Sequence, residues 1–240
     1  MKKVGKSKST LFIAMFVFAM VLCFCPSKKV AASQSVGLPK KSGEAICCMI
    51  VDKNSEYGLF KADLWRLPHG KGMRIVNFKS SNQKVIKTWI AKDEDGDSET
   101  GGWPRLKLKK LGNAKVTLVY KTGGKKYKFS MNIQVIKYQN PLKVFKIGNK
   151  NYAYVYNKVN ARGAAVDENG TKMPPLKAGT YKFTVQTRKN FSLVKNKIYY
   201  DGKGINIKKA KKIKVQTTEY NPFGFQAKYK NKVISNLYFQ

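Results

Sequence analysis

The sequence predicts an all-β protein made of two consecutive β-sandwich-like modules. Short runs alternate apolar and polar residues with a period of two, which is typical of half-buried strands. Turn-forming residues separate these runs every ten residues or so, as in sandwiches of antiparallel sheets. The two longest runs meet at Gly123-Gly124, which suits a tight hairpin.

The central hairpin lies within Leu106–Ile136. A two-residue turn at Gly123-Gly124 needs positive φ at both positions, and glycine adopts this without steric cost. Positions equally distant from the turn then pair, which places all the apolar residues on one face. The expected pairs are Tyr120 with Tyr127, Leu118 with Phe129, Val116 with Met131, and Ala114 with Ile133.

Residues 1–32 have the pattern of a secretory signal peptide. Lysines precede the apolar run Leu11–Cys25, and small residues lead to a cleavage site after Ala32. An uncleaved anchor is the alternative, but this run is shorter than the roughly 20 residues that span a bilayer as a helix. We therefore expect a secreted, extracellular protein, which could also associate with the cell surface.

Cleavage would leave two cysteines, the adjacent pair Cys47-Cys48 in the apolar strand Ala45–Val51. Neighbours in a strand point to opposite faces, so we expect no bond between them. One cysteine is expected in the core and the other outward or under a loop. A redox or metal role is disfavoured because no CxxC spacing or nearby histidine accompanies the pair.

Further strands are expected on both sides of the hairpin in the first half. Tyr57–Leu67 is expected to be a strand with a loop, and Met73–Phe78 and Lys84–Ala91 are expected to be short strands around Ser80-Ser81-Asn82. The polar loop Lys92–Gly102 then leads to the hairpin.

Two segments of the first half resemble bacterial group 2 immunoglobulin-like domains, the intimin/invasin type. They are Val76–Ile86 (VNFKSSNQKVI) and Leu108–Leu118 (LKKLGNAKVTL). The departures are Phe78 for the usual Trp, Leu111 and Asn113 in the glycine turn, and a long acidic insertion between the segments. The resemblance implies an immunoglobulin-like sandwich at 42–139, of the kind used as a spacer or adhesive module, without catalytic residues.

A second β-rich module is expected at 140–240, because Pro141 cannot continue a central strand. Residues 112–118 are echoed by 179–185, which share Gly, Lys and Thr at the same offsets. The opening 140–152 resembles a lysine-rich β-module of secreted proteins from anaerobic Gram-positive bacteria. The last residues, 236–240 (NLYFQ), resemble part of a protease recognition sequence and are open to being chance or a tag remnant. Turns are expected at Gly148-Asn149 and at Asp201-Gly202. The expected strands are Leu142–Ile147, Tyr152–Tyr156, Lys197–Tyr200, Gly204–Ile207, Lys212–Thr217 and Phe223–Tyr229.

The charge balance predicts attraction to polyanions. The chain has 48 Lys and Arg against 13 Asp and Glu, a formal net charge of +35 at pH 7. Most are lysines, which lack the planar fork of arginine, so a diffuse field is favoured over a shaped site. Expected partners are anionic cell-wall polymers or glycans, with no specific nucleic acid; a solvated surface without a partner is the alternative. The candidate polyanion-binding residues are Lys208, Lys209, Lys211, Lys212 and Lys214.

An acidic loop at 93–99 is the one candidate metal site. Asp93, Asp95 and Asp97 alternate like the start of a calcium loop. An EF-hand is excluded because Pro104 occupies the position of the bidentate glutamate. An irregular calcium site and a solvated loop remain open, and no other cofactor is expected.

No catalytic constellation is visible in the sequence. His69 is the only histidine, and no nucleophile elbow accompanies it. We therefore expect a noncatalytic binding or structural protein, adhesive or associated with the envelope through its cationic surface. One alternative is a carbohydrate-active enzyme or its accessory module, with aromatic platforms such as Trp65 or Trp103 and a pair of carboxylates. The other is a spacer without a ligand.

Overall fold

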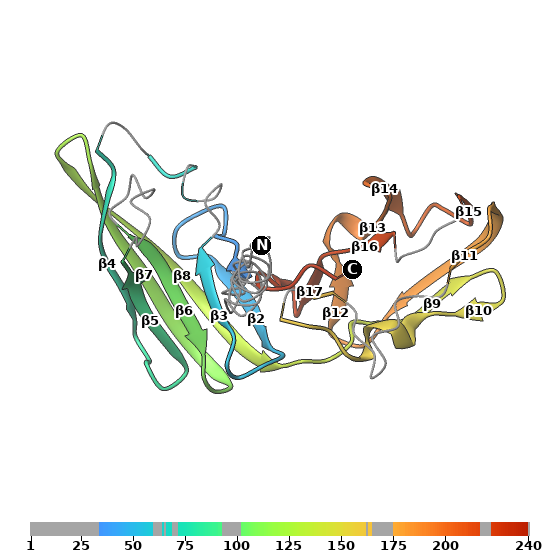
Figure 1. Cartoon of the computed structure of the whole chain (residues 1–240), viewed down its shortest axis with the longest axis horizontal. Helices are drawn as coiled ribbons and strands as arrows, with labels where there is room; N and C mark the ends of the chain where they lie inside the picture. Colours follow the sequence, from blue (N-terminus) through green and yellow to red (C-terminus); the bar gives the residue numbers. More distant parts are fainter. Residues whose placement is uncertain are drawn as a thin grey trace, which may run out of the picture. The chain divides into compact units, whose positions relative to one another are not determined.

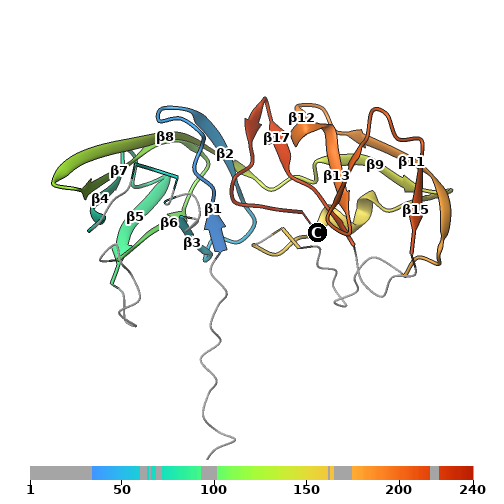
Figure 2. The ribbon, with the colours of Figure 1, turned by 90° about the horizontal axis from the view of Figure 1, so that it is seen from above.

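A computed structural model describes residues 34–59, 64, 66–68, 72–92, 102–161, 163–164, 175–216 and 222–239. These residues form five β-sheets and two short 3-10 helices (Figures 1 and 2), which confirms the all-β prediction. None of the helices in this part of the chain is long and apolar enough to cross a bilayer. The expected signal peptide lies outside the described residues and stays a prediction.

The first half is an immunoglobulin-like β-sandwich of two four-stranded sheets. The first strand pairs in parallel with the third and the second with the eighth, while the other pairings are antiparallel. The two sheets have the A-B-E-D and A′-G-F-C orders of immunoglobulin-like domains. One sheet contains, in spatial order, β1 (Gln34–Val36), β3 (Glu56–Leu59), β6 (Trp103–Leu108) and β5 (Ile86–Ala91). The other contains β2 (Ala45–Ile50), β8 (Lys125–Lys137), β7 (Gly112–Thr122) and β4 (Arg74–Ser80).

The β7–β8 hairpin has the predicted register. Gly123 and Gly124 form the turn with φ of +52° and +75°. Tyr120 lies opposite Tyr127, and their rings stack at 5.4 Å between centroids. The other three predicted pairs are also present. Because the apolar residues of both strands share one face, this hairpin forms much of one wall of the core.

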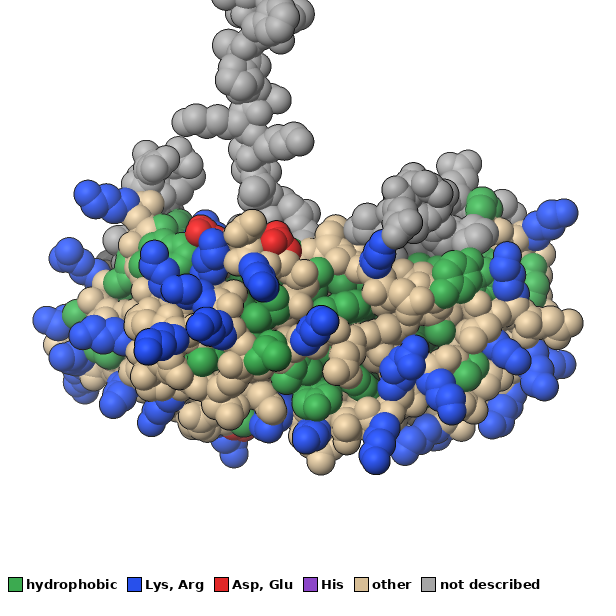
Figure 3. All heavy atoms as spheres, turned by 90° about the horizontal axis from the view of Figure 1, so that it is seen from below, with side chains coloured by type: hydrophobic (Ala, Val, Ile, Leu, Met, Phe, Trp, Pro, Cys, Tyr) green, Lys and Arg blue, Asp and Glu red, His purple; other side chains and the backbone are tan. Residues whose placement is uncertain are grey.

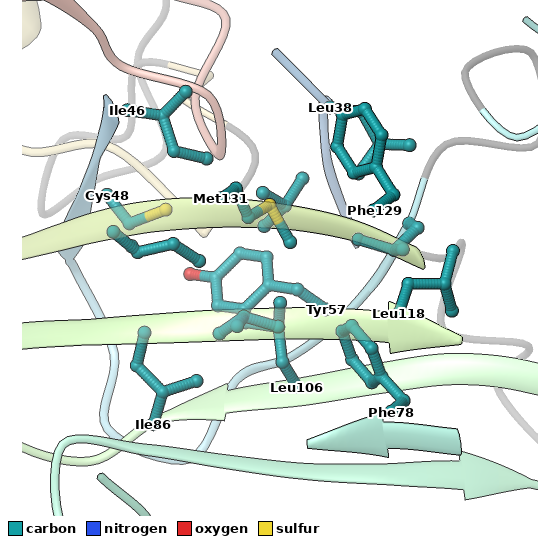
Figure 4. Packing of buried hydrophobic residues seen from close by; sticks show 14 of the residues in the cluster. Leu38, Ile46, Cys48, Tyr57, Phe78, Ile86, Leu106, Leu118, Phe129 and Met131 are labelled. Carbon is teal, nitrogen blue, oxygen red and sulfur yellow. The ribbon is translucent and has the colours of Figure 1, made fainter. Parts of the chain in front are cut away.

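The core of this sandwich lies between its two sheets, where buried side chains from both interdigitate (Figure 4). The ring of Tyr57 lies between Leu106 and Met131, which come from opposite sheets. Phe78, which stands where the resembling family has Trp, is buried in the same core. Phe78 therefore supplies an aromatic side chain to this core.

The second half consists of three small sheets around a separate buried cluster. Its strands confirm the predicted β-rich character and the turns at Gly148-Asn149 and Asp201-Gly202. The largest sheet contains β10 (Lys150–Asn151), β9 (Leu142–Ile147), β11 (Gly179–Thr187) and β15 (Lys212–Val215), in that order. The two others contain β12 (Phe191–Leu193), β17 (Ala227–Tyr229) and β18 (Lys232–Val233), and β14 (Lys203–Asn206), β13 (Lys197–Tyr200) and β16 (Phe223–Gly224). The second 3-10 helix, η2, spans Val194–Asn196.

The expected strand Tyr152–Tyr156 is wrong, because this segment forms the 3-10 helix η1 (Ala153–Asn157). The side-chain oxygen of Asn151 accepts hydrogen bonds from the backbone N–H of Phe145 (3.0 Å) and of Ala153 (3.1 Å). This Asn bends the chain inward, and Tyr156 becomes fully buried against Phe145 and Phe225. Local side-chain hydrogen bonds of this kind compete with strand pairing.

The last residues belong to this second core. Leu237 and Phe239 are buried, and the Phe239 ring stacks on Phe225 at 4.7 Å between centroids. The backbones of Phe225 and Phe239 also exchange hydrogen bonds of 2.9 and 3.0 Å. Residues 236–239 are therefore part of the folded second core, although 236–240 resemble a protease recognition sequence.

Strand β2 contributes side chains to both buried clusters. Ile46 and Cys48 lie in the first, whereas Cys47 and Met49 lie in the second. On one side β2 pairs with β8, and on the other Ile234 forms a parallel bridge with Cys47. A strand buried on both faces needs a continuous apolar run, which Ala45–Ile50 supplies.

One cysteine was expected to point outward or to lie under a loop, and the outward position is wrong. Both thiols are free and their residues are fully buried. Burial raises the pKa of the Cys47 thiol to about 12 and that of Cys48 well above its usual value. Both thiols are therefore neutral near pH 7 and behave as small apolar side chains.

Candidate polyanion-binding surface

The structure divides the five predicted lysines between a turn and an edge strand. Lys208 and Lys209 are exposed in the turn after β14, where the side-chain oxygen of Asn206 accepts a hydrogen bond from the Lys208 N–H (3.0 Å). Lys211 leads into β15, and its carbonyl accepts a hydrogen bond from the Phe183 N–H (2.8 Å). The turn therefore presents exposed lysines to solvent.

Lys212 and Lys214 lie on β15, the edge strand of its sheet. Both are exposed, because they alternate with the buried Ile213 and Val215. On the neighbouring strand β11, Lys182 lies opposite Lys212 and Thr180 opposite Lys214. We call the outward surface of β9, β11 and β15 the β15 face; its polar residues include Lys146, Thr180, Lys182, Thr184, Lys212 and Lys214.

Another basic surface lies on the solvent side of the first sandwich. The outer surface of β4, β7 and β8 carries an open hollow of about 640 Å³. We call this hollow the sheet groove. Its lining consists of lysines, hydroxyl residues, one amide, one aromatic ring and one valine: Asn77, Lys79, Ser80, Ser81, Lys115, Thr117, Val119, Lys126, Tyr127 and Lys128.

The sheet groove continues toward β2. A second open hollow, of about 320 Å³, shares Ser81 and Lys115 with it. At this end Lys232, from β18, donates a hydrogen bond from Nζ to the Oε1 of Gln134 (2.8 Å). The C-terminal part of the chain therefore supplies a further lysine to the same surface.

Register explains how the groove collects its polar side chains. Within this sheet the core-facing residues of β7 lie opposite core-facing residues of β8, so the residues that alternate with them on both strands must face solvent. Lys79 of β4 lies opposite Thr117 of β7, and Lys115 of β7 lies opposite Asn132 of β8. Amines thus sit beside hydroxyl and amide groups on neighbouring strands, at the spacing of direct cross-strand partners.

The charge on this surface is of one sign. The four lysines that line the larger hollow are all exposed, and neither hollow is lined by a described carboxylate. The acidic residues in the described ranges are Glu44, Asp52, Glu56 and Asp201. The carboxylate of Asp52 accepts hydrogen bonds within its own turn from the N–H of Asn54 and the hydroxyl of Ser55. A concave surface lined by like charges focuses the field and attracts anions.

Lysines are not confined to the groove. Figure 3 shows Lys and Arg side chains spread widely over one face of the molecule, with few acidic side chains among them. This distribution agrees with the diffuse field that the lysine-rich composition indicates. The groove combines exposed lysines, hydroxyl groups and an amide in a concave surface.

Sequence reasoning missed the lysines of the sheet groove, although a signal for them was present. The pairing that places the apolar residues of the β7–β8 hairpin on one face also places Lys115, Thr117 and Lys128 on the opposite face. Attention to runs of consecutive lysines favoured 208–214 instead. Lysines spaced two apart on paired strands form a surface that no linear run reveals.

The expected calcium ligands Asp93, Asp95 and Asp97 lie outside the described residues. Within the described ranges, no three His, Cys, Asp or Glu side chains come together in a way that could hold a metal ion. His69 and Trp65 also lie outside these ranges. Trp103 is half-buried and packs against the first core.

No family model matches the chain, and no curated protein matches it. Among solved structures, the Clostridium thermocellum CbhA fibronectin(III)-like modules are 10% identical, with a TM-score of 0.31 and coverage of 83% of this chain and 90% of that one. Mouse clustered PcdhgC3 EC1-3 is 11% identical, with a TM-score of 0.26, over 85% of this chain and 66% of that one. Surface layer protein SbsC, domains 1-6, is 13% identical, with a TM-score of 0.25, over 81% and 22%. The fold assignment therefore rests on strand order and register.

Proposed function

We propose that the protein is a noncatalytic binding protein, secreted or held at the cell surface, whose sheet groove binds anionic cell-wall polymers or glycans. The observation that carries this proposal is a concave sheet surface with four exposed lysines beside hydroxyls and an amide, and no carboxylate among its described lining residues. Lysine amines neutralise anionic groups as point charges, so the groove suits a repeating polymer better than one planar ligand.

We further propose a relationship to the bacterial group 2 immunoglobulin-like domains for 42–139, with a second module at 140–240. The immunoglobulin-like strand order and the buried Phe78 support this relationship. Such modules present ligand-binding or spacer surfaces on a rigid sandwich. Extracellular placement follows from the sequence pattern of residues 1–32.

The alternative of a carbohydrate-active enzyme requires two carboxylates facing each other in a cleft. Lysines and amides line the two hollows described above, so neither one favours that alternative. A spacer without a ligand would show no specific binding, so a binding experiment distinguishes it from the proposed function.

Binding to isolated Gram-positive cell walls, titrated with salt, tests the proposal. We expect affinity to fall steeply as salt rises, because bound polyanions release counterions. The variant K115Q/K126Q/K128Q should bind at least tenfold more weakly, since each exposed charge pair contributes about 0.5 kcal/mol. Glutamine keeps a polar side chain, so the loss reports charge.

The matched control is K53Q/K110Q/K203Q, which removes the same charge from exposed lysines outside both hollows. It should bind within about twofold of the wild type. Equal losses in both variants would indicate a diffuse cationic surface without a groove. Retention that does not depend on salt would indicate a site of different chemistry.

A further inference from the structure

A second outward sheet surface carries the same kinds of side chain as the sheet groove. On the β15 face, Lys182 lies directly opposite Lys212, Thr180 opposite Lys214, and Thr184 opposite Lys146. The residues between them, Phe183 and Ile213, are buried, which fixes the outward direction of the lysines.

Like charges face each other on both surfaces. Lys182 opposes Lys212 on the β15 face, and Lys121 opposes Lys126 beside the sheet groove. Direct cross-strand partners have their Cβ atoms about 5 Å apart, and like charges at this spacing destabilise the pair. An anionic group between two such amines relieves their repulsion, so binding recovers energy that the free protein loses.

The sequence echo places matching residues at matching points of the two sheets. Lys115 and Thr117 lie on β7, between β8 and β4, while Lys182 and Thr184 lie on β11, between β9 and β15. In both sheets an amine and a hydroxyl, two residues apart, face solvent on an interior strand. In both sheets the threonine also lies opposite a lysine of a neighbouring strand, Thr117 opposite Lys79 and Thr184 opposite Lys146, so the two surfaces suit the same class of ligand.

We propose that the β15 face is a second site for the polyanion that the sheet groove binds, so that one chain holds the polymer at two places. This inference rests on the proposed function. The recognised chemistry is a series of phosphate or sulfate groups along a flexible chain, contacted by amines and hydroxyls. Engagement of both faces by one long polymer converts the second contact into an intramolecular step and raises the affinity without new contacts.

Calorimetric titration of the whole protein with a short inorganic polyphosphate tests the proposal by stoichiometry. We expect the wild type to bind two oligomers per chain. The variants K182Q/K212Q/K214Q and K115Q/K126Q/K128Q should each bind one, and K53Q/K110Q/K203Q should keep two. A parallel titration with a short dextran sulfate shows whether phosphate and sulfate serve equally.

Titration with long polyphosphate measures the linkage between the faces. Loss of either face should weaken binding of the long polymer on the order of 100-fold, because the avidity is lost. A wild-type stoichiometry of one, abolished by the groove variant and unchanged by K182Q/K212Q/K214Q, would overturn the second site and leave the proposed function standing. Equal weakening in all three variants would overturn both.

Discussion

At the scale of single residues, the side chain of Asn236 makes the backbone hydrogen bonds that a neighbouring strand would otherwise make to β2. Its side-chain N–H donates to the carbonyl of Met49 (2.8 Å), and its side-chain oxygen accepts from the Met49 N–H (2.9 Å). Asn236 is only 4% exposed, so water cannot replace these bonds. One amide side chain thus satisfies both backbone groups of a buried residue.

Replacing Asn236 with alanine should therefore lower the free energy of unfolding by about 2 kcal/mol or more, because two buried backbone groups lose their partners. Urea denaturation followed by circular dichroism measures the change. Asn113→Ala is the matched control, since Asn113 is an exposed amide on β7. A loss for Asn236→Ala no larger than that of the control would show that Met49 finds other partners.

At the scale of elements, the turn between β7 and β8 sets the register of the hairpin. Gly123 and Gly124 both have positive φ, and a Cβ at either position would meet nothing within 4 Å. Any cost of substitution there is consequently conformational and does not arise from a clash with neighbours.

We expect Gly123→Ala/Gly124→Ala to lower the free energy of unfolding by about 2 kcal/mol, at roughly 1 kcal/mol for each left-handed residue. Gly123→Asn should stay close to the wild type, because asparagine tolerates positive φ and Asn-Gly suits this turn. Thermal unfolding of the three proteins measures the difference. Similar losses for alanine and asparagine would contradict a conformational origin.

At the scale of the whole described chain, β2 joins the stability of two buried clusters. Its side chains alternate between them, and residues 234–236 bond to its free edge. Unfolding of either cluster therefore exposes one face of β2 to water and destabilises the other cluster. The boundary predicted at Asn140-Pro141 stays untested, although Asn140 is itself buried and donates to the carbonyl of Ala153 (2.7 Å).

We expect residues 34–239 to unfold in one cooperative transition. All three tryptophans lie in the first half, so their fluorescence reports that half alone. Hydrogen exchange at β11 and β13, followed by mass spectrometry across the same urea series, reports the second half. Amides there that open while the fluorescence is still native would indicate two independent units.

Sequence alone determined the elements whose signals are local. The period of two and the glycine pair defined β7 and β8 to the exact partner, and the turns at Gly148-Asn149 and Asp201-Gly202 were equally readable. Each of these features depends on residues within one hairpin. The same reasoning predicts which side chains of this hairpin face solvent. Among them are Lys115, Lys126 and Lys128, which line the sheet groove.

Tertiary structure alone decided the features that depend on distant residues. Whether Cys47 faces water is settled by Ile234, and the partner of Met49 lies 187 positions away in the chain. Likewise Tyr156 enters a core whose other rings, Phe225 and Phe239, come from the C-terminal part. Alternation and turn chemistry show which way a side chain points relative to its strand. They carry no information on what covers that face, because burial is a property of the surfaces that meet there.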